Sequence, residues 1–127
     1  MQGKHLYEYA IIRLVPQVER GEYINIGVIL MDVNNDYVGM KYAIDEDRLK
    51  AFSSDIDVEM IKEYLAGWLK VCDGKNNGGK IGGMDLKFRF RWLTANRSTI
   101  IQTSPVHPGF SNDPKAELDR LMKKFVL

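Results

Sequence analysis

Alternating apolar and polar positions dominate the first third of the chain. Residues 7–15 are rich in aromatic and β-branched side chains and end before a proline, which is typical of a strand. Residues 23–33 predict a second strand, with the even-numbered positions of 24–30 forming one apolar face. Residues 37–43 alternate again after an Asn-Asn-Asp turn signal. The short connections favour an antiparallel meander.

A helical period appears later in the chain. Asp45 predicts the cap of a short helix that ends near Phe52. Asp57 predicts the cap of a longer helix, whose apolar stripe falls at i, i+3 and i+4 spacing. The stripe consists of Ile61, Tyr64, Leu65, Trp68, Leu69 and Cys72. A last helix is expected after Asp113, with Pro114 at its first position.

The segments between these helices are harder to assign. Residues 84–93 fit a two-residue period and a helical period, and Asp85 as a cap favours the helix. Residues 98–103 predict another strand, whereas 104–112, with two prolines and a glycine, predict a structured loop. Together these elements predict a single α+β domain over residues 1–127. Its antiparallel meander of three to four strands would pack against three to four helices.

Composition narrows the class of protein. Apolar residues make up 45% and charged residues 28% of the 127 residues, as in ordinary globular domains. The longest apolar runs are shorter than the ~20 residues of a membrane-spanning helix, and the first residues lack a signal-peptide pattern. The single cysteine, Cys72, cannot form an internal disulfide and is expected in the core rather than as a reactive thiol. We therefore expect a cytoplasmic protein that has no membrane partner.

Charge is balanced overall but not locally. The net charge of +1 makes nucleic-acid binding an unlikely function, because polyanion binders carry a large basic excess. Residues 45–63 hold seven acidic and three basic side chains, whereas residues 80–97 hold one acidic and five basic side chains. Such asymmetry indicates either a partner surface or two solvated segments that face each other.

Three residues interrupt the apolar strands. Arg13 must either reach the solvent face of the sheet or meet an acidic or phosphate partner. Asn25 and Gly27 are poor strand formers, and a glycine within a strand often marks a bulge or a close backbone approach. The two-residue period predicts Asn25 and Gly27 on one face. If Arg13 lies across from them, that face would hold a small polar pocket.

Further polar residues gather near the end of the chain. Arg91, Arg97 and Ser98 offer forked donors and a hydroxyl suited to a carboxylate or phosphate, although the same residues are typical of a helix C-terminus. Ser104 and His107 lie in a proline-stiffened segment. They show no triad or nucleophile-elbow pattern, so no reaction class is indicated.

No metal or cofactor is expected from the sequence. The two histidines have no metal-ligand spacing, and one cysteine cannot build a thiolate site. The glycine-rich segment at residues 73–79 is expected to be a flexible loop, and it lacks the Lys-Ser/Thr ending of a phosphate-binding loop.

Two long segments resemble a known family. They read YEYAIIRLVPQVERGEYINIGVIL (residues 7–30) and FRWLTANRSTIIQTSPVHPGFSNDP (residues 90–114). Both look like the bacterial family grouped as domain of unknown function 3037. The resemblance implies no established activity, but it implies a gene neighbourhood with HipA-like serine/threonine kinases. The positions that match the family pattern are Arg13, Pro16, Glu19, Asn25, Gly27, Arg91, Arg97, Ser98, Ser104, Pro105, His107, Gly109 and Pro114.

Two functions remain open at this point. The first is a small interaction module for a protein partner, such as a HipA-like kinase, that uses the basic stretch 87–97 or the open edge of the meander. The second is an enzyme or binding protein for an anionic or phosphorylated small ligand. There, three arginines would hold the anion, two polar residues would orient it, and His107 would transfer the proton. The three arginines are Arg13, Arg91 and Arg97, and the orienting residues are Asn25 and Ser98.

Overall fold

The computed structural model describes residues 4–74 and 79–127. Its strands are β1 (His5–Leu14), β2 (Ile24–Asp32), β3 (Tyr37–Tyr42), β4 (Ile101–Thr103) and β5 (His107–Ser111). Its helices are α1 (Glu46–Phe52), α2 (Val58–Asp73), α3 (Gly79–Gly82), α4 (Leu86–Leu93) and α5 (Pro114–Phe125). Two short 3-10 turns, η1 (Val18–Arg20) and η2 (Val33–Asn35), follow β1 and β2. No helix in these ranges is both long and apolar enough to cross a membrane.

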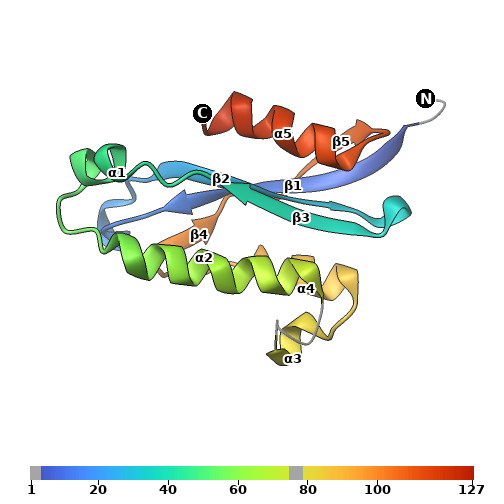
Figure 1. Ribbon diagram of the computed structural model, residues 1–127, viewed down its shortest axis with the longest axis horizontal. Coiled ribbons are helices and arrows are strands. Elements are labelled where there is room, and N and C mark those ends of the chain that lie inside the picture. The colour runs from blue at the N-terminus through green and yellow to red at the C-terminus, as the bar shows by residue number, and fades with distance from the viewer. Residues whose placement is uncertain (1–3, 75–78) are drawn as a thin grey trace.

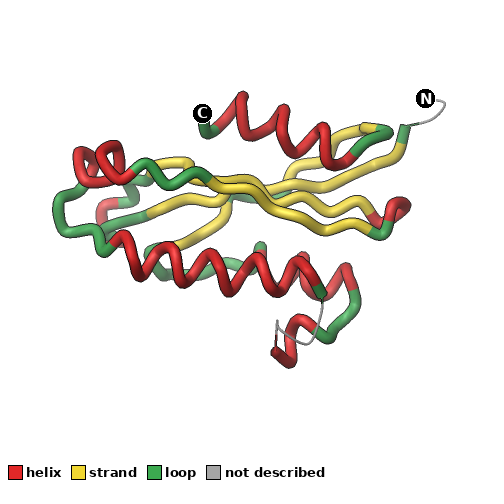
Figure 2. The backbone as a smooth tube through the Cα atoms, in the orientation of Figure 1, coloured by secondary structure: helices red, strands yellow, loops and turns green. Residues whose placement is uncertain are grey.

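The strands form one antiparallel sheet that lies between two helical layers. The strand order is β3-β2-β1-β4, and β5 pairs with the same edge of β1 as β4 does. Helix α5 covers one face, whereas α2 and α4 cover the other (Figures 1 and 2). The predicted α+β class with an antiparallel meander is therefore confirmed.

A bulge in β2 changes which side chains face which layer. Ile12 of β1 lies opposite Gly27, but the next residue, Arg13, lies opposite Asn25, so Ile26 is the extra residue. Gly27 also approaches β3 closely. A Cβ at position 27 would lie 2.6 Å from the carbonyl oxygen of Lys41, which confirms the expected close backbone approach.

Strand β2 is consequently buried on both faces. Ile26 packs in the core under α2 and α4, whereas Val28 and Leu30 pack against α5. The prediction of one apolar face for residues 24–30 was therefore wrong, because the bulge reverses the alternation within the strand. A central strand that is covered by helices on both sides needs apolar residues at every position.

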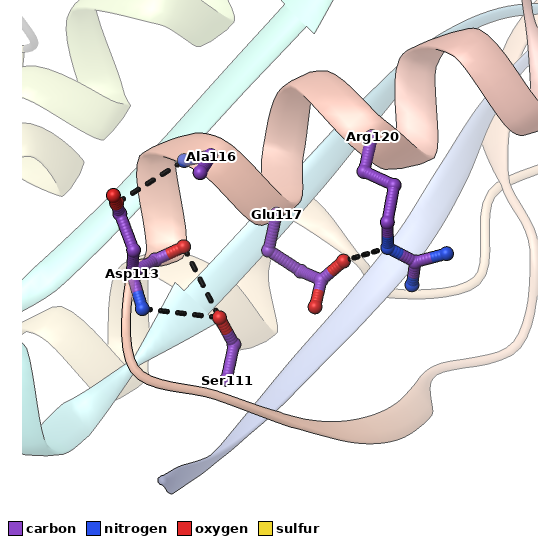
Figure 3. A network of polar contacts seen from close by, with 5 residues as sticks. All are labelled: Ser111, Asp113, Ala116, Glu117 and Arg120. Carbon is purple, nitrogen blue, oxygen red and sulfur yellow. Dashed lines mark hydrogen bonds and ion pairs between the residues drawn. The ribbon is translucent and has the colours of Figure 1, made fainter. Parts of the chain in front are cut away.

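The helix starts follow the predicted caps. The side chains of Asp45, Asp57, Asp85 and Asp113 each accept a hydrogen bond from the backbone N–H three residues later. Figure 3 shows the last of these caps, where Ser111 Oγ also accepts from the Asp113 N–H at 3.0 Å. Residues 84–93 are thus helical over α4, as Asp85 indicated. The loop predicted at 73–79 lies partly outside the described residues.

The segment predicted as a loop at 104–112 contains β5, so that prediction was wrong. Its prolines indicated irregular structure. Pro108, however, occupies a position in β5 whose backbone nitrogen does not face β1, so the pairing with β1 loses no hydrogen bond there. In the antiparallel ladder the hydrogen-bonding groups of His107, Gly109 and Ser111 point to β1, so the Pro108 nitrogen lies on the outer edge. The predicted strand at 98–103 is shorter and covers only β4.

Ser104 joins the two strands that share one edge of β1. Its N–H donates to the carbonyl of Ile11 at 2.8 Å, and its Oγ accepts from the Ile11 N–H at 2.8 Å. The hydroxyl itself donates to the carbonyl of Pro105 at 2.9 Å, and Ser104 is only 3% exposed. The Ser104 side chain therefore supplies the acceptor for the buried Ile11 N–H, at the point where the pairing partner of β1 changes from β5 to β4.

We expect Gly27→Ala to destabilise the fold by about 1–3 kcal/mol, because the backbone of β3 cannot yield to a new methyl group. Urea unfolding measures the change. Gly67→Ala is the matched control: it lies in α2 with nothing within 4 Å of the added atom, and it should stabilise by about 1 kcal/mol. Equal effects of the two substitutions would contradict the close approach.

We also expect Ser104→Ala to lower the free energy of unfolding by about 1–3 kcal/mol, because it leaves the Ile11 N–H without an acceptor. Ser98→Ala removes the same hydroxyl from an exposed position and should change stability by less than about 0.5 kcal/mol. The two variants are compared by thermal and urea unfolding. A Ser104→Ala variant as stable as Ser98→Ala would show that Ile11 finds another acceptor.

Candidate functional site

The seven predicted site residues fall into two groups on opposite faces of the sheet. The first group lies on the α5 face and consists of Arg13, Asn25, Ser104 and His107. The second group belongs to α4 and the segment after it and consists of Arg91, Arg97 and Ser98. The structure therefore does not bring the three arginines of the predicted anion site together.

Arg97 closes the C-terminal end of α4. Its guanidinium donates to the carbonyls of Leu93 at 2.8 Å and Trp92 at 2.6 Å, and it lies 5.0 Å from the ring centre of Trp68. Burial lowers the pKa of the Arg97 guanidinium, and aromatic faces and helix carbonyls compensate for its lost hydration. Capping thus occupies the donors that an anion would need.

The rest of the basic stretch is also engaged within the protein. Arg89 donates to the carbonyls of Val71 at 3.0 Å and Cys72 at 2.7 Å, which lie at the end of α2. Arg91 Nη1 lies 2.7 Å from a carboxylate oxygen of Glu8 on β1. The local excess of positive charge therefore serves mainly to hold α2, α4 and β1 together.

Cys72 is a core residue, as expected. Its side chain is buried under the sheet, and burial raises the pKa of the thiol to about 12. A thiol that stays protonated at physiological pH is a poor nucleophile and a poor metal ligand. Within residues 4–74 and 79–127, no group of three or more His, Cys, Asp or Glu side chains is placed to hold a metal ion.

Arg13 and Asn25 lie directly across from each other, which the sequence had left as a condition for a polar pocket. The Arg13 guanidinium lies over the ring of Tyr23, with 4.1 Å between its central carbon and the ring centre. Asn25 Nδ2 donates to the carbonyl of Phe125 at 3.2 Å. Because of the bulge, Gly27 faces the opposite layer, so its predicted place beside Asn25 was wrong.

Two polar atoms at this position have no partner in the described chain. They are Nε of Arg13 and Oδ1 of Asn25, and both are inaccessible to solvent. Buried polar atoms in native proteins are almost always hydrogen-bonded, so these two atoms depart from the usual pattern. No other arginine within residues 4–74 and 79–127 has a buried nitrogen without a hydrogen-bond partner.

The remaining arginines all have protein acceptors. Arg20 and Arg120 pair with glutamates, Arg91 pairs with Glu8, and Arg48 donates to the carbonyl of Val126 at 3.1 Å. Arg89 and Arg97 donate to the helix carbonyls described above. Among the seven arginines of the chain, Arg13 alone lacks an acceptor in the part that the structure describes.

His107 is exposed and lies apart from Arg13. Its ring centre is 5.6 Å from that of Tyr9, its partner on β1. Tyr9 and Arg13 are four residues apart on an extended strand, a separation of about 13 Å. His107 therefore cannot exchange a proton directly with a small ligand held by Arg13, and the Oγ of Ser104 is committed to the sheet.

A groove that the sequence did not predict lies along β3. It has a volume of ≈ 470 Å³, and its apolar lining comes from β3, α2, α5 and the last residue. Those apolar residues are Met40, Tyr42, Leu69, Met122 and Leu127. Leu69 belongs to the apolar stripe predicted for α2, but it is 38% exposed rather than buried in the core. The exposure of Leu69 can be related to a groove only once β3 is known to be the edge strand of the sheet.

Residues 40–42 of β3 line this groove, and β3 is an edge strand of the sheet. The N–H of Ala43 donates to the carbonyl of Ile26, so the ladder alternation turns the N–H and C=O groups of Val38, Met40 and Tyr42 away from β2. Figure 1 shows β3 passing between α5 and α2. The opposite edge is different, because Pro108 offers no N–H there.

Comparison with known proteins supports the family resemblance. No curated protein and no solved structure matches the chain. The model of the family described as "Protein of unknown function (DUF3037)" matches residues 9–126, which include β2 through α5 and most of β1. The chain therefore belongs to the DUF3037 family of proteins of unknown function.

Proposed function

We propose that this protein binds an extended segment of a partner protein by adding it as a strand to β3. The observation that carries this proposal is the open edge of β3, which is recessed in an apolar groove between two helices. Unpaired strand edges are intrinsically adhesive, and proteins usually protect them with prolines, charges or covering loops. Here the β5 edge has such a proline, whereas the groove along β3 has five apolar lining residues beside the charged Lys41, Asp119 and Lys123.

The spacing of strands in a sheet determines where an added strand would lie. An added strand would lie about 4.8 Å from β3 and bond to the outward groups of Val38, Met40 and Tyr42. Its alternate side chains would contact Leu69 on one side and Met122 on the other. Backbone bonds would supply much of the affinity, and the two walls would select the side chains.

Charge in the groove suggests the composition of the segment. Lys41 pairs with Asp119, so these two charges compensate each other. Lys123 also lines the groove and has no acidic partner among the described residues. We therefore expect a segment that alternates apolar residues toward both walls and places an acidic residue near Lys123. A segment of a HipA-like kinase, the partner class that the family resemblance implies, is the first to test.

The proposal is tested by purifying the tagged protein from its own host and quantifying co-purifying proteins by mass spectrometry. Leu69→Glu should reduce recovery of the partner at least about tenfold, which corresponds to about 1.4 kcal/mol, because it places a charge in the apolar wall. Phe110→Glu is the control, since Phe110 is also an exposed apolar residue but lies on β5 at the opposite edge. A partner that Leu69→Glu retains would exclude the groove.

Amide exchange then locates the contact in the purified complex. Partner binding should slow exchange at Val38, Met40 and Tyr42 by about tenfold or more, because these N–H groups gain acceptors. The N–H groups of Gly39 and Lys41 already bond to β2 and serve as internal controls. Protection without any partner, together with a dimer in sedimentation, would instead indicate a second copy of this chain on β3 and overturn the proposal.

A further inference from the structure

We propose that a second groove, at the end of β1, binds a protein segment that carries an apolar side chain next to lysine or arginine. Two adjoining hollows, of ≈ 220 and ≈ 250 Å³, form this groove. Pro16, Gln17 and Ser53 line both hollows, so we call it the Ser53 groove. It lies between the turn after β1 and the connection from α1 to α2, at one end of the sheet (Figure 1). It shares no lining residue with the groove along β3, so the proposal is independent of that surface.

Both buried and exposed apolar side chains line the Ser53 groove. Leu14 and Ile61 reach it from the core and are 1% and 0% exposed, whereas Phe52 and Met60 are 39% and 42% exposed. Neither Phe52 nor Met60 belongs to the core clusters of the described chain. Single exposed apolar residues are common, but exposed ones gathered around a hollow are typical of a contact surface. The groove therefore offers apolar surface that the fold itself does not use.

Carboxylates supply the charge of this groove. Glu22 lines one hollow and pairs with Arg20. Asp57 lines the other hollow and caps α2, where it accepts from the Met60 N–H at 3.1 Å. Asp55 also lines that hollow, and it forms no ion pair within residues 4–74 and 79–127. Its charge is thus available to a cation that enters the groove.

The acidic stretch 45–63 and the basic stretch 80–97 do not neutralise each other. Lys62 pairs with Glu46 and Glu59 inside the acidic stretch, and Arg91 pairs with Glu8 on β1. Among the residues that the structure describes, no ion pair joins the two stretches. The seven acidic and three basic side chains of 45–63 therefore leave a negative potential beside the groove, which complements a basic partner. An anionic membrane surface or a nucleic acid would be repelled.

The size and polarity of the groove favour a peptide over a free small molecule. Each hollow is smaller than the ~300 Å³ at which small-molecule sites begin, so single side chains of a longer segment fit better than a whole ligand. The Gln17 amide and the Ser53 hydroxyl line both hollows and can donate to and accept from a peptide backbone between them.

Two tripeptides, each acetylated and amidated, test the groove: lysyl-leucyl-lysine and glutamyl-leucyl-glutamate. Backbone amide signals of the wild-type protein are followed by NMR up to about 20 mM peptide, because ligands of this size bind in about the millimolar range. The basic peptide should shift the signals of Gln17, Ser53 and Asp55 saturably, and the acidic peptide should bind at least about fivefold more weakly. The signals of Met40 and Tyr42, in the groove along β3, are the internal control for the basic peptide.

Three variants complete the experiment, and their folding is checked by the amide spectrum. Asp55→Asn keeps the size but removes the charge, and it should weaken binding of the basic peptide about two- to fivefold. Asp47→Asn removes the same charge from the acidic stretch outside both hollows, and it should change the affinity by less than about 1.5-fold. Met60→Gln keeps the length of the side chain but reduces the apolar contact, and it should weaken binding about twofold or more.

Three results would overturn the proposal: no saturable shift with the basic peptide, equal affinity for the two peptides, or equal effects of Asp55→Asn and Asp47→Asn. An unchanged affinity in Met60→Gln would overturn the apolar contact that the proposal assigns to this groove.

Discussion

The hydrogen bonds along the two edges of β1 determine where every other element of this protein lies. One edge pairs with β2 throughout, and the other pairs first with β5 and then with β4. Both faces of β1 are covered, so its backbone cannot rely on water where the partner changes. Ser104 supplies the missing acceptor at that point. Ser104, a candidate binding residue from the sequence, is therefore a requirement of the sheet.

The same accounting explains most of the arginines. The C-terminal ends of α2, α4 and α5 each receive a guanidinium, from Arg89, Arg97 and Arg48 respectively. Helix ends expose unpaired carbonyls and carry partial negative charge, so a forked cation satisfies both needs. In a chain with a net charge of +1, six arginines are thus used for assembly rather than recognition. The seventh, Arg13, instead stacks on the ring of Tyr23.

The sequence predicted what depends on neighbouring residues and missed what depends on distant ones. Helix starts at Asp57, Asp85 and Asp113 follow from local capping, and the structure confirms them. The faces of β2 were misassigned, because a bulge is set by pairing with β1 rather than by the residues of β2 alone. β5 was missed because a proline in the sequence predicts a loop. A proline is compatible with a strand when its nitrogen lies on the outer edge, and this depends on how β5 pairs with β1.

The candidate sites divide in the same way. Arg13 and Asn25 stood out because each departs from strand composition, and their pairing needed only the β1–β2 register. The role of Arg97 was open between anion binding and capping, and its contacts with the end of α4 required the folded helix. The β3 groove combines residues 40–42 with Leu69 and residues 119–127, a set that no local pattern connects.

The proposed function comes from groups that the fold leaves unpaired, the outward N–H and C=O groups of β3. Helix α5 forms one wall of the groove beside them, and Asn25 holds the end of this helix by donating to the carbonyl of Phe125. A change at Asn25 therefore acts on the groove indirectly, through the position of α5, whereas a change at Leu69 alters the wall on α2 directly.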